Sequence, residues 1–453
     1  MISTDKLGTE RVNKLLFRLG WPAALNIMVV AIYNITDIIF AGRWLGSIQI
    51  AAVVIVGAVN YLFSSFGLAI GIGGSSIIAR AFGEKDTEKA AKVFANQVML
   101  VVICSIVLVS FGWIFESFVL RSFGAYGEIF GPARVYYRIL LMGVPLLSLS
   151  MMGNNVIQTE GKAGTAMFNS LIPTIVNLIL NPVFIKGFKM GIGGAAWATL
   201  TAYILGFLLV LRFFAGRATE IRFNRSHMRL NMKLVREIAE IGGSLLINVF
   251  ATNILVVFLN KVLFKYQQES GVVIYSIVNR ISMLFLIPIF GIDGGIRPII
   301  GFNFGSNQMD RIRAVVNSAI KYGLGICYLL LGIVFWGSNI LVRLFTDDLP
   351  VVAATLPALK IVLSFFPLFI IEVTTIAYFQ SIGRPQVAFC LILLRNIILL
   401  IPLLYVLPGY FGYHGILFAF PTADILTTIF AFWLLRNELY FKLPKRVGAS
   451  FKP

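Results

Sequence analysis

Long apolar segments alternate with short polar ones along almost the whole chain. Each apolar segment is roughly 20 residues or longer, which is the length that an α-helix needs to cross the hydrocarbon core of a bilayer. The segments lie at residues 19–41, 48–73, 92–114, 135–158, 165–186, 191–214, 242–264, 272–297, 315–337, 357–381, 386–408 and 414–435. The pattern predicts an all-α integral membrane protein with twelve transmembrane helices.

A polar segment divides these predicted helices into two sets of six. We therefore expect an N-terminal lobe over residues 1–214, a linker over 215–240 and a C-terminal lobe over 241–453. Lysine and arginine are concentrated before the first helix, in the linker and after the last helix, and these segments share one side of the membrane if the helix count is even. Because basic loops stay in the cytoplasm, both termini and the linker are expected there.

The two halves repeat at a constant spacing. Corresponding residues differ by 222 positions in the pairs Gly20 and Gly242, Gly83 and Gly305, Pro145 and Pro367, and Gly161 and Gly383. An even number of helices in each half gives both halves the same orientation, so they are related by an axis along the membrane normal. Two such pseudo-symmetric six-helix bundles with a central cleft are the architecture of a transporter.

Composition and charge narrow the function classes. Hydrophobic residues make up 58% of the chain and charged residues 13%, which excludes an ordinary soluble protein. The net charge of +18 comes from basic residues scattered between apolar spans, so it indicates contact with anionic lipid headgroups rather than with nucleic acid. Cys104, Cys327 and Cys390 lie in apolar runs and predict neither disulfides nor a metal site. No nucleotide-binding, nucleophile or metal motif is evident, so we expect neither an enzyme nor a cofactor.

The first apolar segment carries a carboxylate. Asp37 lies between Trp21 and Trp44, with the apolar residues of positions 38–40 after it. A carboxylate within a membrane span is costly and usually marks an ion, proton or substrate site. Tyr33 precedes it by four residues and shares its helical face, and Pro22 can begin or bend the same helix. The alternative is that Asp37 lies at the water interface and ends the helix.

A second polar set lies on later helices of the same half. Asn177 and Asn181 are four residues apart and share one face of the fifth helix, Thr199 lies on the sixth, and Asn154 lies on the fourth. One carboxylate among amide and hydroxyl oxygens suits a proton or a monovalent cation, because Mg²⁺ and Ca²⁺ gather more carboxylates. The alternative is that these side chains simply bridge helices.

The second half lacks this polar set and has charges of its own. Leucines at 259, 399 and 403 occupy the positions that correspond to Asp37, Asn177 and Asn181. Its charged residues within predicted helices are Arg280, Asp293, Arg297, Glu372, Arg395 and Asp424. Glu372, Arg395 and Asp424 lie in consecutive helices and can form a buried cluster that contacts substrate or holds a second proton. They can equally form a mutually neutralising structural network. Asp293 has no assigned role.

Four stretches together resemble the multidrug and toxic compound extrusion (MATE) transporters of prokaryotes. They are NITDIIFAGRWLGSIQIAA, NLILNPVFIKGFKMGIGGAAWAT, VNRISMLFLIPIFGIDGGIRPIIGFNFGS and FQSIGRPQVAFCLILLRN, and the similarity extends over essentially the whole chain. The resemblance implies two six-helix lobes that form a V. It also implies a secondary active antiporter that exports organic, often cationic, compounds by alternating access, driven by a sodium or proton gradient.

The resemblance also assigns residues. It implies an ion-coupling site at Asp37, Asn177 and Thr199, neighbouring pocket positions at Tyr33 and Asn154, and a bending role for Pro22. The chain departs from the family at Asn181, where the pattern usually supplies a second aspartate. That departure puts a two-carboxylate proton relay in doubt and leaves sodium possible, with Asn181 as a neutral oxygen ligand.

We accordingly predict a monomeric exporter in the prokaryotic plasma (inner) membrane. Its coupling ion, sodium or a proton, is expected at Asp37, Asn177, Asn181 and Thr199. Its small organic substrate is expected to contact Tyr33, Asn154, Glu372 and Arg395. The alternative is a flippase for lipid-linked oligosaccharide or polysaccharide precursors from the same wider superfamily. Such a flippase needs a strongly basic central cavity, and the first half offers few basic residues within its helices.

Overall fold

The computed structural model describes residues 4–222 and 227–442. Within these ranges, the side chains of residues 30–35, 37–39, 41–43, 269 and 441–442 are not described. The described residues are almost entirely helical, and no strand occurs among them. This agrees with the all-α class predicted from the apolar segments.

The helices of the first half begin at the N-terminus with a single short turn. They are α1 (Lys6–Thr9), α2 (Val12–Leu45), α3 (Ser47–Gly83), α4 (Thr87–Ile114), α5 (Glu116–Ser122), α6 (Phe130–Thr159), α7 (Ala163–Pro182) and α8 (Gly191–Ala215). The second half contains α9 (Met232–Gly305), α10 (Met309–Arg343), α11 (Leu349–Leu363), α12 (Phe369–Ser381), α13 (Pro385–Leu393), α14 (Leu400–Phe411) and α15 (Tyr413–Asn437).

Eleven spans among the described residues are long and apolar enough to cross a membrane. Helix α9 supplies two of them, because its backbone turns sharply at Gln268, where φ is 52°. Helix α2 is the remaining long helix, with 34 residues. The twelve predicted helices are therefore confirmed, each extending beyond its apolar segment. Helix α9 begins at Met232, inside the segment 215–240 that was predicted as the linker.

The chain divides into two compact units, and each unit contains helical segments from both halves of the chain. Unit 1 comprises Leu25–Gly243 with the first residues of the chain up to Lys6, and unit 2 comprises Leu7–Ala24 with the chain from Ser244 onward. The start of α2 thus belongs with the second half and the start of α9 with the first. Lobe boundaries at 214 and 241 follow the sequence repeat and remain a prediction.

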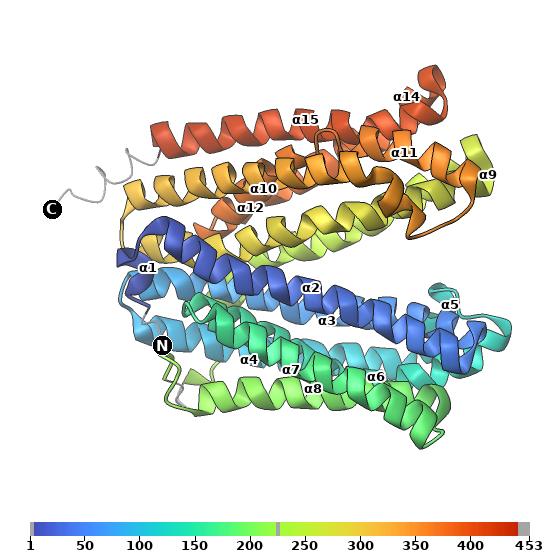
Figure 1. Ribbon diagram of the computed structural model, residues 1–453. Coiled ribbons are helices and arrows are strands. Elements are labelled where there is room, and N and C mark those ends of the chain that lie inside the picture. The colour runs from blue at the N-terminus through green and yellow to red at the C-terminus, as the bar shows by residue number, and fades with distance from the viewer. Residues whose placement is uncertain (1–3, 223–226, 443–453) are drawn as a thin grey trace. The chain divides into compact units, whose positions relative to one another are not determined.

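The core of unit 1 lies between α3, α6 and α8 (Figure 1). Glycine lets α3 approach α6 closely, since a methyl group at Gly67 would lie 2.5 Å from the Cα of Ser148. Glycine likewise lets the start of α9 pack closely on α3, because a methyl group at Gly242 would overlap the carbonyl oxygen of Ala69. Small residues at helix contacts are the usual basis of close packing in membranes.

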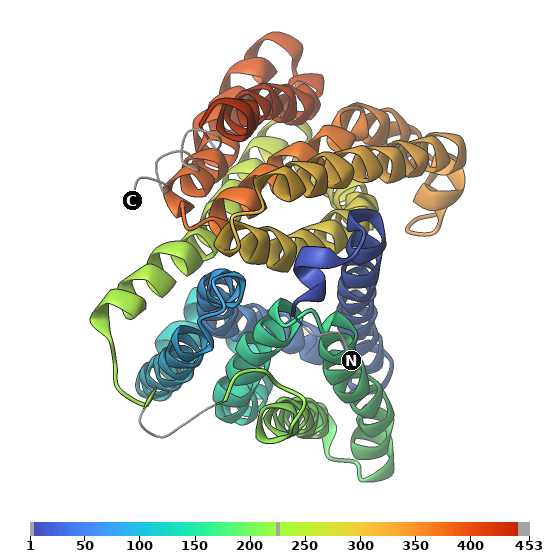
Figure 2. The ribbon, with the colours of Figure 1, turned by 90° about the vertical axis from the view of Figure 1, so that its left-hand side faces the viewer.

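Unit 2 packs α9 through α15 around a second apolar core (Figure 1). The first half of α2 joins it through glycines, with Gly20 and Gly291 facing each other at backbone distance. The amide of Asn303 also donates a hydrogen bond to the carbonyl of Leu7 at 3.0 Å. Within each unit the long helices share one general direction (Figure 1), and the view from one end shows that they are inclined to one another (Figure 2).

Three wider π-helical turns occur among the described residues, and one of them, Glu438–Lys442, follows α15. Of the other two, the first covers Val183–Gly187 directly after α7, and the second covers Leu394–Leu399 between α13 and α14. Pro182 explains the first, because proline contributes no amide hydrogen to the helix ladder. π-helical turns occur frequently at functional sites, and both of these border polar side chains.

Candidate functional site

Three of the predicted ion-coupling side chains meet in the interior of unit 1. The amide of Asn181 donates to Asn177 Oδ1 at 2.7 Å, and the amide of Asn177 donates to Thr199 Oγ1 at 3.2 Å. Each of the three residues is no more than 2% exposed. A buried polar chain of this kind is retained only where its hydrogen bonds are made, because an unpaired polar group in an apolar interior is costly.

The local sequence places these groups on facing helices. Asn177 and Asn181 lie one turn apart on α7, so they stack along one face. Helix α8 begins with small residues and approaches the end of α7 closely, since a methyl group at Gly194 would lie 2.9 Å from the carbonyl carbon of Phe184. That approach brings Thr199 against Asn177. Thr201, two residues later, is only partly buried and its hydroxyl donates to the carbonyl of Trp197 instead.

Asn154 lies in a separate polar group between α6 and α7. Its amide donates to Ser170 Oγ at 3.5 Å, and its Oδ1 accepts from the amide of Asn169 at 3.3 Å. Asn169 is 6% exposed and was not singled out from the sequence. A signal for it was present, because Asn169 precedes Asn177 by eight residues, which places both near one face of α7.

The remaining predicted positions of the first helix are only partly described. The side chains of Tyr33 and Asp37 lie outside the described residues, so their place relative to the asparagines remains a prediction. Pro22 lies inside α2, where its missing amide removes one hydrogen bond of the ladder. Its role in bending the helix likewise remains a prediction.

A charged cluster lies in the interior of unit 2, and three helical segments build it. Arg395 contacts Asp424 Oδ1 through Nε at 2.9 Å and through Nη2 at 2.8 Å. Its Nε lies 3.6 Å from Glu372 Oε2, an oxygen without a hydrogen-bond partner among the described residues. The side chains of Glu372 and Asp424 are 3% and 2% exposed. The three charges predicted to cluster are therefore brought together.

Neutral groups complete this cluster. The guanidinium of Arg395 lies 4.8 Å from the ring centre of Phe369, within the range of a cation–π interaction. Its Nη1 donates to Asn396 Oδ1 at 3.1 Å, and the amide of Asn396 donates to Asn248 Oδ1 at 3.4 Å. Arg395 and Asn396 belong to the π-helical turn that begins at Leu394. No pattern in the sequence indicated that Phe369 or Asn248 would contact the charged residues or their neighbours.

Asp293 belongs to a different network of unit 2. Both of its carboxylate oxygens accept from Arg297 Nε at 3.0 Å, one helical turn away on α9. Arg297 Nη1 also donates to Gln380 Oε1, and the amide of Gln380 donates to Ser244 Oγ at 2.6 Å. Because the acid and the base are directly paired, this network ties α12 to α9 rather than forming a free charged site. Arg280 is exposed on the same helix.

Together these groups define what the arrangement can do chemically. Unit 1 offers neutral amide and hydroxyl oxygens, and unit 2 offers two carboxylates against one guanidinium. No group of three or more histidine, cysteine, aspartate or glutamate side chains that could hold a metal occurs in the described part of the chain. The neutral oxygens suit a weakly bound monovalent ion, and the surplus carboxylate suits a proton or an organic cation.

Comparison with known proteins places the chain in a family. The MatE family model matches residues 22–183 and 241–406. The multidrug export protein MepA of Staphylococcus saprophyticus is 24% identical over 423 residues, which cover 92% of this chain and 93% of the relative. A crystal structure of MATE in a bent conformation has 25% identity and a TM-score of 0.93, covering 98% of this chain and 99% of that one. A crystal structure of MATE in a straight conformation has 25% identity and a TM-score of 0.92, covering 97% and 98%.

The family match extends over most of both halves, and the structural likeness extends over nearly the whole chain. Both agree with the long apolar helices and with the resemblance found in the sequence. The chain therefore belongs to the MatE family of multidrug and toxic compound extrusion transporters, and it is a multi-pass membrane protein with their fold.

Proposed function

We propose that this protein is a secondary active antiporter that exports organic, often cationic, compounds in exchange for sodium ions or protons. The observation that carries the proposal is the buried chain Asn181–Asn177–Thr199 in unit 1. Polar groups at this depth are uncommon in membrane helices and mark ion or substrate paths. Membership of a family whose relatives include a named multidrug export protein supports the same function.

The coupling step requires a charge beside these neutral groups. Asp37 of α2 is the acid assigned to this role by the family resemblance, and it binds the incoming sodium ion or proton. Neutralising its charge lowers the cost of burying it, because an isolated charge in an apolar interior is far less stable than a neutral group. The helix then bends near Pro22 and substrate leaves the cavity, which completes one alternation of access.

Asn181 bears on the choice of ion. An asparagine cannot titrate, so Asp37 is the one acid proposed for this site. The amide oxygen of Asn181 can still coordinate a cation. Asn177, Asn181, Thr199 and Asp37 supply the oxygen types that a monovalent cation accepts. Sodium binding and protonation of Asp37 are both compatible with this donor set. Export driven separately by a sodium gradient and by a pH gradient distinguishes them.

The charged cluster of unit 2 is assigned to substrate. Two carboxylates and one guanidinium leave one formal negative charge when all are ionised. The side chains of both acids, Glu372 and Asp424, are buried. An organic cation or a proton near Glu372 neutralises it. Glu372 and Arg395 are the substrate contacts proposed for unit 2, and contacts of Tyr33 and Asn154 with substrate remain a prediction from the family resemblance. A pocket with few fixed polar groups admits varied substrates.

The test uses purified protein in liposomes loaded with a fluorescent organic cation. A sodium gradient and a pH gradient are imposed separately, and export is compared between wild type, Asp37→Asn and Thr199→Val. We expect one gradient to drive export and Asp37→Asn to abolish it. Thr199→Val should slow coupled export by on the order of tenfold, which corresponds to the loss of one buried hydrogen bond.

A matched control is available two residues away. Thr201→Val makes the same chemical change at a partly buried side chain that bonds its own helix, so export should continue at the wild-type rate. Full gradient-driven export by Asp37→Asn would overturn the coupling mechanism. Absence of export under both gradients would favour the flippase, and lipid-linked sugars would then be tested as cargo.

A further inference from the structure

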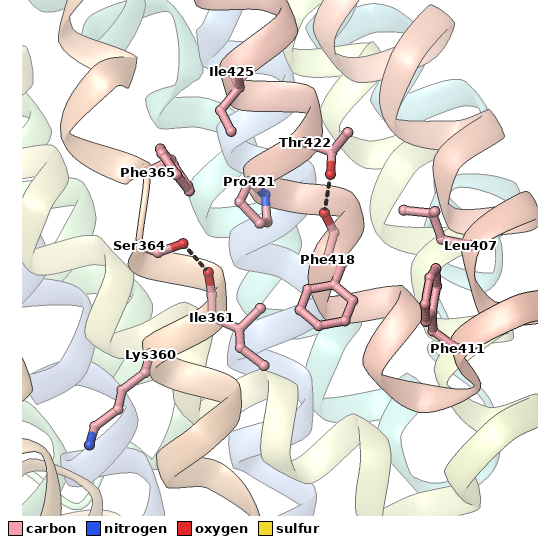
Figure 3. Close-up of a pocket in the computed structure, with 10 residues that line it drawn as sticks. All are labelled: Lys360, Ile361, Ser364, Phe365, Leu407, Phe411, Phe418, Pro421, Thr422 and Ile425. Atoms are coloured by element: carbon pink, nitrogen blue, oxygen red, sulfur yellow. Dashed lines mark hydrogen bonds between the residues drawn. The ribbon is translucent and has the colours of Figure 1, made fainter.

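An apolar groove opens on unit 2 between α11, α14 and α15. Its volume is about 580 Å³, and its lining includes Phe365, Phe411 and Phe418 together with Pro421 of α15 (Figure 3). The three phenylalanines are 43%, 57% and 38% exposed, so the groove is open rather than sealed in the core. Thr422 and Ser364 also line it, but their hydroxyls donate to carbonyls of their own helices, at 2.8 Å and 2.7 Å. The groove therefore presents mainly hydrocarbon.

A single charged residue, Lys360, lines the groove. It lies within the membrane span Leu349–Ser381 and is exposed. Among the described residues, no carboxylate lies within 4.0 Å of its ammonium, although other basic residues of both units are paired. An ionisable side chain within a span is rare and is normally paired, so a partner from outside the chain is indicated.

In the sequence repeat, the residue that corresponds to Lys360 has an internal partner. The residue 222 positions earlier is Arg138, whose Nε lies 2.8 Å from Glu116 Oε2. Arg134 pairs with the other oxygen of the same carboxylate. In the second half, the positions that correspond to Glu116 and Arg134 are held by Ser338 and Leu356. The second half therefore lacks the acid and one of the two bases, and Lys360 is the one charged residue at these three positions.

Lys360 lies three residues after the start of the apolar segment 357–381, within about one helical turn, so its long side chain can reach the headgroup region. Phe411 ends α14 and Phe418 lies near the start of α15, so the groove opens toward the same end. Figure 3 shows the Lys360 ammonium directed toward that end and Ile425 at the opposite end. Long basic side chains reach the headgroup region in this way while their stems stay in hydrocarbon.

The α15 side of the groove can hold part of one lipid chain. It extends from Phe418 to Ile425, seven residues or about 10 Å along the helix. The hydrocarbon of one leaflet is about 15 Å thick, half the bilayer core. An acyl chain can therefore lie along Phe418, Pro421 and Ile425 while its phosphate remains within reach of the ammonium.

We propose that this groove is a phospholipid site, in which Lys360 binds the phosphate and the aromatic lining binds an acyl chain. Anionic phospholipids are preferred over zwitterionic ones, because phosphatidylcholine carries a choline cation that Lys360 repels. The same repulsion disfavours an organic cation, so the groove is distinct from the substrate pocket. The site does not depend on the proposed export function.

Lipid binding is measured by native mass spectrometry of the detergent-purified protein, titrated with phosphatidylglycerol or phosphatidylcholine of the same chains. We expect wild type to bind phosphatidylglycerol several-fold more tightly. Lys360→Gln should bring the ratio of the two affinities close to one, whereas Lys360→Arg should preserve it. Thr422→Trp, which fills the groove, should weaken both lipids. The exposed Lys321 of α10 provides a control for net charge, since Lys321→Gln should leave the ratio unchanged.

Three outcomes of the lipid titration would overturn the proposal. They are equal binding of both lipids by wild type, an unchanged ratio in Lys360→Gln, and an equal loss of preference in Lys321→Gln. Size-exclusion chromatography of each variant shows whether it remains folded, and Lys360→Arg keeps the test valid if the neutral variant does not. Tight binding of an organic anion in place of either lipid would also contradict the assignment.

Discussion

Removal of the Arg395 guanidinium provides the sharpest test of the charged cluster in unit 2. Arg395→Met keeps a flexible apolar stem of similar length but leaves Asp424 and Glu372 without their cation. The side chains of both acids are almost fully buried, at 2% and 3% exposure. Breaking a buried ion pair by deleting one partner typically costs about 3–5 kcal/mol, so we expect the free energy of unfolding to fall by about that amount.

The two carboxylates should differ in their contributions. Asp424 receives two close contacts from Arg395, at 2.8 Å and 2.9 Å, whereas Glu372 lies 3.6 Å away and makes no hydrogen bond to it. A hydrogen bond to a charged group contributes about 1.5–3 kcal/mol, so Asp424→Asn should cost about that much. Glu372→Gln removes the surplus negative charge and loses no hydrogen bond, so it should cost less than about 1 kcal/mol.

The assay is unfolding of the purified protein in mixed micelles, followed by helicity as a denaturing detergent is added. The triple variant Glu372→Gln, Arg395→Met and Asp424→Asn contains no buried charge in the cluster and should recover much of the loss seen for Arg395→Met. A cost for Glu372→Gln equal to that for Asp424→Asn would refute the ranking. Stability of Arg395→Met within about 1 kcal/mol of wild type would refute the ion-pair reasoning itself.

Two further predictions concern packing and charge in unit 1. Gly242→Ala should destabilise the protein by about 1–3 kcal/mol, because its methyl group would overlap the carbonyl oxygen of Ala69, whereas Gly243→Ala has open space and should be neutral or stabilising in the same unfolding assay. A similar loss for both would contradict the close approach. Lys162→Met should cost about 3 kcal/mol, because the ammonium bonds Glu160 at 2.5 Å and both side chains are buried. Adding Glu160→Gln should restore part of that loss, and an unchanged cost in the double variant would count against the pair.

The extent of the helices and part of the candidate site could be predicted from the sequence. Apolar length alone determines where helices cross a membrane, because backbone hydrogen bonds must be satisfied within each span. The contact between Asn177 and Asn181 also followed from their spacing of one helical turn, and the structure places them 2.7 Å apart. Such features are local, so they depend only on residues that are close in the chain.

Only the tertiary structure decided which helices meet. Thr199 and Thr201 are the same residue type two positions apart, yet the packing of α8 on α7 buries the first fully and the second only in part. Helix packing likewise decides that Asn154 accepts a hydrogen bond from Asn169 and lies apart from the chain of Asn177 and Asn181. The start of α2 packs with the second half of the chain through Gly20. The sequence repeat does not indicate this contact. These contacts depend on close approach between segments distant in sequence, which periodicity and composition do not encode.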